Sequence, residues 1–163
     1  TRLVGSEMCI ETDSVHAASH PHTFIYRGSE VNTSGNPLTH TVLRGAVNKK
    51  GQCIPNYHYE DLERLHEIYA SKDLKNPAAI IDANHSNSNK QFKQQIRITS
   101  EVLHSRRYNP EFKKLVKGVM IESYLEEGNQ KICKDMIYGK SITDPCLGWD
   151  DTENLIYKIA DEC

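Results

Sequence analysis

Three side chains that can ligate a metal ion follow three separate apolar segments of the chain. His85 lies in IIDANHSNSNKQ, Glu122 in GVMIESYLEEGNQ and Asp144 in YGKSITDPCLGW. One imidazole and two carboxylates form a suitable ligand set for a divalent cation of intermediate hardness, of the manganese, iron, cobalt or zinc class. Arg44, at the end of the apolar segment HTVLR, adds a fixed positive charge beside them. This combination predicts a metal site with an adjacent anion-binding group.

The segments that precede these residues have the composition of buried strands, and amphipathic segments separate them. AAIID is typical of a strand that is covered on both faces, because no polar residue interrupts its apolar run. The predicted strands cover residues 40–44, 78–82, 115–123 and 138–143, and the predicted helices cover residues 9–19, 59–71, 89–107 and 149–162. This alternation indicates βα units and a parallel sheet.

The carboxyl ends of parallel strands in an α/β barrel all face the same cleft. His85, Glu122 and Asp144 are therefore expected to converge there, although they lie far apart in the sequence. The periodicity alone does not distinguish a closed barrel from an open, doubly wound sheet.

Two irregular segments and one helix start complete the predicted organisation. Residues 22–33 are expected to form a short two-stranded hairpin, with its turn at Ser34-Gly35-Asn36-Pro37. Residues 45–57, rich in Gly, Asn and Lys, are expected to form a loop. Asp150 or Asp151 is the expected N-cap of the last helix.

Length and composition restrict the class of protein. The 163 residues correspond to one domain, and a net charge of −2 gives no indication of a nucleic-acid or membrane surface. No apolar segment approaches the ~20 residues that span a bilayer, and the first residues, TRLVGSEMCIETD, contain no apolar core of a signal peptide. The five cysteines have no CxxC spacing, which indicates free thiols in a reducing cytoplasm rather than a zinc site.

Four segments together resemble a known enzyme family. LRG, IDANHSNSNKQF, GVMIESYLEEGNQ and YGKSITDPCLGWDDTE are similar, in the same order, to blocks of the type I 3-deoxy-D-arabino-heptulosonate 7-phosphate (DAHP) synthases. The resemblance covers roughly residues 15–163 and extends over the C-terminal half of that family's barrel. It implies a (β/α)8 TIM barrel, of which this chain holds the last four βα units and a small hairpin.

The resemblance also implies an activity and roles for individual residues. The family condenses phosphoenolpyruvate with erythrose 4-phosphate in the first step of the shikimate pathway, as a cytoplasmic, homo-oligomeric enzyme. His85, Glu122 and Asp144 resemble its divalent-metal ligands, and Arg44 resembles its phosphoenolpyruvate-binding arginine. Phe24 and Val31 lie in the hairpin where the family forms its aromatic amino-acid feedback pocket.

The chain departs from the family pattern in ways that affect the expected activity. The family's fourth metal ligand is a cysteine in a Gly-Pro-Cys-Ser block, and this block and most phosphate-binding motifs are absent. The fifth-strand block is also absent, and the chain runs LVGSEMC at that point. Two explanations are open: the sequence is part of a longer chain, or the protein is a truncated, non-catalytic half-barrel that acts as a regulatory or assembly module. In either case the 163 residues alone are not expected to catalyse the reaction.

Each site residue also has a structural interpretation. His85 could be a hydrogen-bonded histidine, Asp144 could be a cap that precedes a helix, and Arg44 could be the partner of a structural ion pair. Cys146 lies close to Asp144 but is expected to be a small buried apolar residue. The pair His20 and His22 is expected to belong to a turn, and Phe24 and Val31 could simply pack within their hairpin.

Overall fold

The computed structural model describes residues 6–72 and 74–163, with the side chains from residue 11 onward. The LVG segment at residues 3–5, where the sequence departs from the expected fifth-strand block, lies outside the described residues. The described elements follow one another as α1 (Ser6–Ser19), β1 (Thr23–Tyr26), β2 (Ser29–Asn32), β3 (Thr41–Leu43), β4 (Ala46–Val47), β5 (Cys53–Ile54), α2 (Tyr59–Ser71), β6 (Ala79–Asp82), α3 (Gln94–Tyr108), α4 (Pro110–Leu115), β7 (Val116–Met120), β8 (Glu126–Asn129), β9 (Lys140–Ser141) and α5 (Trp149–Glu162).

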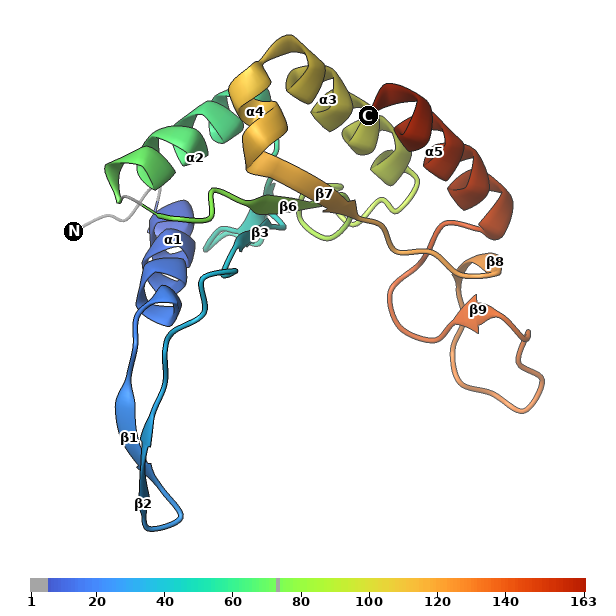
Figure 1. Ribbon diagram of the computed structural model, residues 1–163. Coiled ribbons are helices and arrows are strands. Elements are labelled where there is room, and N and C mark those ends of the chain that lie inside the picture. Colours follow the sequence, from blue (N-terminus) through green and yellow to red (C-terminus); the bar gives the residue numbers. More distant parts are fainter. Residues whose placement is uncertain (1–5, 73) are drawn as a thin grey trace.

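A parallel three-stranded sheet in the order β3-β6-β7 forms the centre of the molecule. Leu43 of β3 pairs with Ile81 of β6, and Asp82 of β6 pairs with Met120 of β7. The connections between these strands contain α2 and the pair α3–α4, as parallel pairing requires. Figure 1 shows α2, α4, α3 and α5 along the outer side of the sheet. The α/β class is therefore confirmed, and the three strands end at one common edge.

The core lies between the sheet and these helices. It consists of fully buried aliphatic and aromatic side chains from the strands and from α2, α3 and α4, because each of these three helices turns an apolar stripe toward the strands. The members include Leu43, Leu62, Leu65, Ala79, Ile81, Ile98, Val102, Phe112, Leu115 and Val116. Tyr69 of α2 adds a polar link, since its hydroxyl donates to the carbonyl of Ala78 at 2.8 Å and accepts from the backbone N–H of Thr41 at 3.2 Å. These contacts fix α2 against the start of β3 and β6.

The predicted hairpin is present, but its turn is not where the sequence indicated. β1 and β2 pair through Tyr26 and Ser29, so the turn is made by Arg27 and Gly28, both with positive φ, at 50° and 81°. This is the geometry of a two-residue turn with left-handed central residues, which matches the twist of the two strands. The expected turn at residues 34–37 instead leads from β2 to β3, and the hairpin projects from the body (Figure 1).

The far end of the chain also differs from expectation. The predicted strand at residues 138–143 is reduced to β9, which pairs in parallel with β8 and not with the three-stranded sheet. Ile142 and Thr143 are exposed, so this segment lacks the burial on both faces that a central parallel strand needs. An isolated parallel bridge between Ser123 and Leu147 joins this part of the chain to the end of β7.

Local backbone chemistry accounts for the remaining differences. The helix predicted at residues 89–107 begins only at Gln94, because Asn89 and Lys90 have positive φ and cannot be helical. The short helix α4 was not predicted, although Asn109 caps it by accepting from the backbone N–H of Glu111, at 3.0 Å.

The last helix and the predicted loop show smaller corrections. Gly148 is the N-cap of α5, so Asp150 and Asp151 are not its cap and lie in its first turn, where they complement the helix dipole. The loop predicted at residues 45–57 contains the short antiparallel pair β4–β5.

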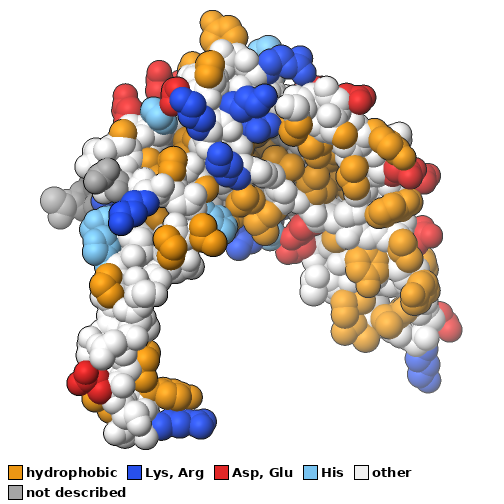
Figure 2. Space-filling model, in the orientation of Figure 1, with side chains coloured by type: hydrophobic (Ala, Val, Ile, Leu, Met, Phe, Trp, Pro, Cys, Tyr) orange, Lys and Arg blue, Asp and Glu red, His pale blue; other side chains and the backbone are white. Residues whose placement is uncertain are grey.

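Among the described residues, no helix is both long enough and apolar enough to cross a membrane. Figure 2 shows the molecule as an arch, with the β1–β2 hairpin as one arm and the β8–β9 segment as the other. Apolar side chains gather on the β8–β9 arm, where Tyr124, Leu125, Ile137, Tyr138 and Trp149 are exposed.

Candidate metal centre

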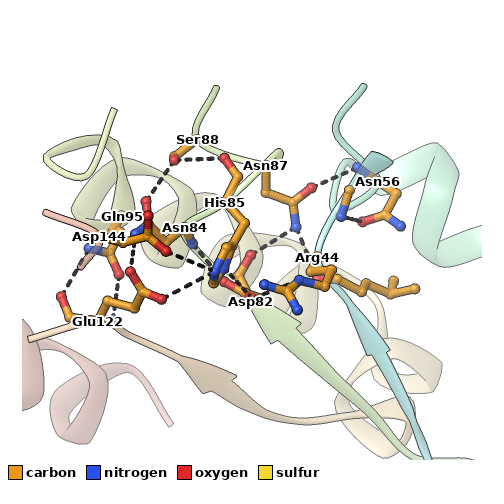
Figure 3. A network of polar contacts seen from close by, with 12 residues as sticks. Arg44, Asn56, Asp82, Asn84, His85, Asn87, Ser88, Gln95, Glu122 and Asp144 are labelled. Carbon is orange, nitrogen blue, oxygen red and sulfur yellow. Dashed lines mark hydrogen bonds and ion pairs between the residues drawn. The ribbon is translucent and has the colours of Figure 1, made fainter. Parts of the chain in front are cut away.

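The three predicted metal-binding residues lie together at the carboxyl edge of the sheet. One ligand atom from each of His85, Glu122 and Asp144 lies within 4.8 Å of the others. The Nε2 atom of His85 is 3.2 Å from Oε1 of Glu122 and 3.8 Å from Oδ2 of Asp144. Figure 3 shows the imidazole between the two carboxylates on one side and Asp82 on the other. The distances between these atoms are those of groups that share one small ion.

His85 is presented by a tight turn that follows β6. Its backbone has φ of 50°, in the left-handed region that residues other than glycine adopt uncommonly, with Asn, Asp and His the most frequent among them. The Nδ1 atom of His85 lies 2.8 Å from Oδ2 of Asp82, which is buried. If Nδ1 donates its proton to this carboxylate, the lone pair of Nε2 is available to a cation held between Nε2 and the carboxylates of Glu122 and Asp144. A strained backbone held by a buried partner is a common feature of functional sites.

Glu122 is held at both its backbone and its carboxylate. The side chain of Gln95, fully buried at the start of α3, accepts from the backbone N–H of Glu122 at 2.7 Å and donates to its carbonyl at 3.1 Å. The amide of Asn84 donates to Oε2 of Glu122 at 2.6 Å. Ser88 in turn donates to Oδ1 of Asn84 at 2.8 Å, which fixes the orientation of that amide.

Asp144 differs from the other two residues because its side chain is 67% exposed. It lies in the segment after β9, and its backbone carbonyl accepts the thiol of Cys146 at 3.4 Å. Burial raises the pKa of the Cys146 thiol, and the negative charges of Glu122 and Asp144 act in the same direction. Cys146 is therefore a buried, protonated thiol, as the sequence indicated, because a raised pKa disfavours the thiolate that binds metals.

Arg44 follows β3 directly and reaches the same edge of the sheet. Its Nε atom is 3.7 Å from Oδ2 of Asp82, and its side chain is 55% exposed. Gly45 has φ of 71°, and a Cβ atom there would lie 2.8 Å from the carbonyl oxygen of Ile54. The glycine thus permits the close approach of β5 beside the arginine. Arg44 forms an ion pair and also keeps half of its surface open to solvent.

The donor set fits a divalent metal ion. It consists of an imidazole nitrogen and carboxylate oxygens that converge from three loops, and two of the three side chains are already oriented by buried partners. Two carboxylates and one neutral imidazole carry a net negative charge, which a divalent cation would compensate. Water or a further residue would complete the coordination, as in metal sites that keep a position open for substrate.

Sequence reasoning missed the polar residues that support this centre. Asp82, Asn84 and Gln95 are buried, and each contacts a predicted ligand. A signal was available for Asp82, because a carboxylate at the end of an apolar strand and three residues before a histidine needs a partner. Gln95 gave no such signal, since its role depends on how α3 lies against the end of β7.

The remaining predicted positions lie away from this centre, in or near the projecting hairpin. Phe24 and Val31 are direct cross-strand partners, Phe24 is exposed, and Val31 is partly buried. The Nε2 atom of His22 lies 2.9 Å from the carbonyl of Ala17, and Nδ1 of His20 lies 2.8 Å from that of His16. These histidines therefore contact the end of α1, which agrees with the expected turn.

The fold and the site define the chain as an α/β protein with a candidate metal centre at the carboxyl edge of a parallel sheet. Residues 5–156 match the DAHP synthetase I family, and the chain belongs to that family. It is 40% identical over 162 residues to the Trp-sensitive phospho-2-dehydro-3-deoxyheptonate aldolase of Buchnera aphidicola, covering 93% of this chain and 42% of that protein. The Trp-sensitive enzyme of Escherichia coli K12 is 36% identical over 162 residues, with the same coverage.

A solved structure agrees with this assignment. The phospho-2-dehydro-3-deoxyheptonate aldolase of Francisella tularensis superposes with a TM-score of 0.83 at 27% identity, covering 96% of this chain and 45% of that one. The chain thus spans less than half the length of the relatives that it matches.

Proposed function

We propose that these residues form the metal-binding half of the active site of a DAHP synthase, an enzyme that condenses phosphoenolpyruvate with erythrose 4-phosphate. The observation that carries this proposal is the convergence of His85, Glu122 and Asp144, with ligand atoms within 4.8 Å of one another. Membership of the DAHP synthetase I family supports the same reaction. In this reaction a carbon–carbon bond forms between the two substrates, water adds to the enol carbon, and phosphate leaves.

The architecture that we propose is the last four βα units of a (β/α)8 barrel. The parallel order β3-β6-β7, with helices on the outer side, supports it. In a barrel, the open edges of this sheet would be paired with further strands, because an unpaired parallel edge exposes backbone donors and acceptors. The similar Francisella tularensis structure is more than twice as long as this chain, which supports the presence of further strands in a complete barrel.

Each residue of the centre has a task in the proposed reaction. His85, Glu122 and Asp144 would hold the divalent ion, of the manganese, iron, cobalt or zinc class, which supplies Lewis acidity toward the aldehyde or toward water. Arg44 binds an anionic group of phosphoenolpyruvate, because the guanidinium fork matches phosphate and carboxylate oxygens. Its half-exposed side chain leaves donors available for that purpose.

The hairpin is the proposed site of feedback regulation. Phe24 is exposed beside its partner Val31, so an aromatic amino acid could pack against this face. The relatives from Buchnera aphidicola and Escherichia coli are named Trp-sensitive, which supports an aromatic effector for this chain. We further propose that the protein is a cytoplasmic homo-oligomer, in keeping with a biosynthetic enzyme of this family.

A non-catalytic half-barrel is the second candidate function, because the described centre contains three of the four ligands expected for the family. The two candidates differ in what residues 1–163 can do when they are expressed alone. We expect this polypeptide to be aggregated or molten and to lack activity, since its sheet edges are unpaired. A soluble, monodisperse, inactive product that binds a partner protein would favour the regulatory or assembly module.

The test of the proposed function is a condensation assay on the natural gene product that carries this sequence. We expect activity with phosphoenolpyruvate and erythrose 4-phosphate, loss of activity on chelation, and recovery when manganese is returned. His85→Asn should remove this metal-dependent activity while the protein still folds, because asparagine tolerates the left-handed backbone at this position. Full activity of the chelated protein, or of the His85→Asn variant, would contradict the proposal.

A further inference from the structure

We propose that Asp82 is a positioning residue that links the metal centre to the substrate-binding arginine. One carboxylate oxygen, Oδ2, faces Nδ1 of His85 at 2.8 Å and Nε of Arg44 at 3.7 Å. Asp82 would thereby fix both groups at once, and this inference rests on the proposed function of the site. Figure 3 shows Asp82 between the two side chains, at the end of its strand.

The position of Asp82 makes its carboxylate rigid. It is the last residue of β6, paired with Met120 of β7, and only 2% of its side chain is exposed. Its other oxygen, Oδ1, accepts from the backbone N–H of Asn84 at 2.9 Å, which tightens the turn that leads to His85. A carboxylate held at three points, with almost no contact with solvent, has little freedom to follow the movements of its partners.

A buried carboxylate needs positive or hydrogen-bonding partners, because an uncompensated buried charge is costly. Asp82 finds them in His85 and Arg44, which come from two different loops. The hydrogen bond to Nδ1 selects the tautomer whose Nε2 lone pair faces Glu122, as the outer partners of metal-binding histidines commonly do. Contact with Nε of Arg44 leaves the terminal nitrogens of the guanidinium free for an anion.

Asparagine at this position cannot serve all three partners. The donors from Asn84, His85 and Arg44 would face one amide oxygen and one NH2 group, so at least one donor would meet another donor. Asp82→Asn is therefore nearly identical in shape but breaks the shared contact. A purely structural role would predict only lower stability from this change.

The experiment measures two readouts on the natural gene product. The first is the affinity for Mn²⁺ alone, without substrates, by competition with a chromogenic chelator. Asp82→Asn should weaken it by about 10–100-fold, the usual effect of losing the outer partner of a metal ligand. The second is the Michaelis constant for phosphoenolpyruvate at saturating Mn²⁺, which should rise more than that for erythrose 4-phosphate.

A double-mutant cycle tests the link to Arg44. Arg44→Ala should raise the Michaelis constant for phosphoenolpyruvate less in the Asp82→Asn background than in the wild type, because the arginine is already displaced there. If Arg44→Ala raises this Michaelis constant by the same factor in both backgrounds, the proposed link is overturned. Unchanged Mn²⁺ affinity of Asp82→Asn would overturn the positioning of His85.

Asp61→Asn is the matched control. Asp61 is a partly buried carboxylate that accepts from the backbone N–H of His58 at the start of α2, so its loss removes the same charge away from the metal centre. It should leave Mn²⁺ affinity unchanged, and an equal loss of affinity would show a general effect of destabilisation and overturn the inference. Wild-type protein without Mn²⁺ binding or activity would instead contradict the proposed function itself, which separates the two failures.

Discussion

The side chain of Gln95 pairs with the backbone of Glu122 in the manner of a neighbouring β-strand. Its amide oxygen accepts from the N–H of Glu122 at 2.7 Å, and its amide nitrogen donates to the carbonyl of the same residue at 3.1 Å. The chain has just left β7 at this point, and the carbonyl of Glu122 also accepts from the backbone N–H of Leu147, at 3.0 Å. A helix side chain thereby extends the sheet by one residue and aims a carboxylate at the metal centre.

Gln95→Leu should lower both stability and metal affinity. The change leaves the backbone N–H of Glu122 without its partner in a partly buried place, at a cost of about 1–3 kcal/mol. The carbonyl of Glu122 keeps its hydrogen bond from the backbone N–H of Leu147, at 3.0 Å. Thermal unfolding and Mn²⁺ titration check the two effects. Gln94→Leu is the control on the same helix, because the side chain of Gln94 accepts from Arg97, at 2.8 Å, at the exposed surface of α3. Equal effects of both variants would contradict the clamp at Glu122.

Arg44→Lys should weaken the binding of phosphoenolpyruvate more than that of erythrose 4-phosphate. Lysine keeps the charge but loses the planar fork, and it cannot contact Asp82 and an anion with the same geometry. Steady-state kinetics with each substrate varied in turn provides the comparison. If the two Michaelis constants rise equally, or do not change, Arg44 only forms a structural ion pair.

Phe24→Ala should reduce inhibition by aromatic amino acids and leave the uninhibited rate unchanged. Phe24 is exposed and pairs with Val31, whereas its neighbour Ile25 points to the opposite face of the hairpin and is 70% exposed. Inhibition curves for tryptophan, phenylalanine and tyrosine are compared for Phe24→Ala and for the control Ile25→Ala. If the Phe24→Ala variant is inhibited as strongly as the wild type, Phe24 and Val31 only pack within their hairpin and do not bind an effector.

Tyr69→Phe should destabilise the fold, and the difference should shrink in alkali. Its hydroxyl forms hydrogen bonds with the carbonyl of Ala78 and the backbone N–H of Thr41, so removing it costs about 1–3 kcal/mol. Burial raises the pKa of Tyr69 above its ordinary value of 10.0. As the pH rises above that value, the Tyr69 hydroxyl loses its proton in the unfolded chain before it does so in the folded protein. This lowers the stability of the wild type, whereas the Tyr69→Phe variant has no such proton to lose.

Unfolding midpoints between neutral pH and pH above 10.0 measure this difference. Tyr108→Phe is the control, since Tyr108 is 75% exposed. A wild-type advantage that stays constant or grows across this range would contradict the assigned role of the Tyr69 hydroxyl.

The sequence predicted the features that depend on local pattern. α2 occupies the predicted residues 59–71, and β3 and β6 lie within one residue of the predicted strands, because their apolar periodicity agrees with their burial. The proximity of His85 and Glu122 could be predicted because β6 and β7 end at one edge of a parallel sheet. Asp144 joins them by another route, since β9 does not belong to that sheet.

Features that depend on backbone strain or tertiary contact could not be predicted in this way. The late start of α3 follows from left-handed residues at Asn89 and Lys90, neither of which is glycine. The separation of β9 from the central sheet follows from pairing with β8, which no sequence period revealed. The supporting roles of Asp82 and Gln95 arise only when loops from different strands meet.

The location of bound Mn²⁺ in the natural gene product tests the central claim most directly. Crystals grown with Mn²⁺ and measured for anomalous scattering should give one strong peak bounded by His85, Glu122 and Asp144. Ligand atoms should approach it at roughly 2.0–2.3 Å, the range for nitrogen and oxygen ligands of such ions. A peak elsewhere in an active enzyme, or no peak at this centre under conditions that support activity, would contradict the assignment of these residues as the metal site.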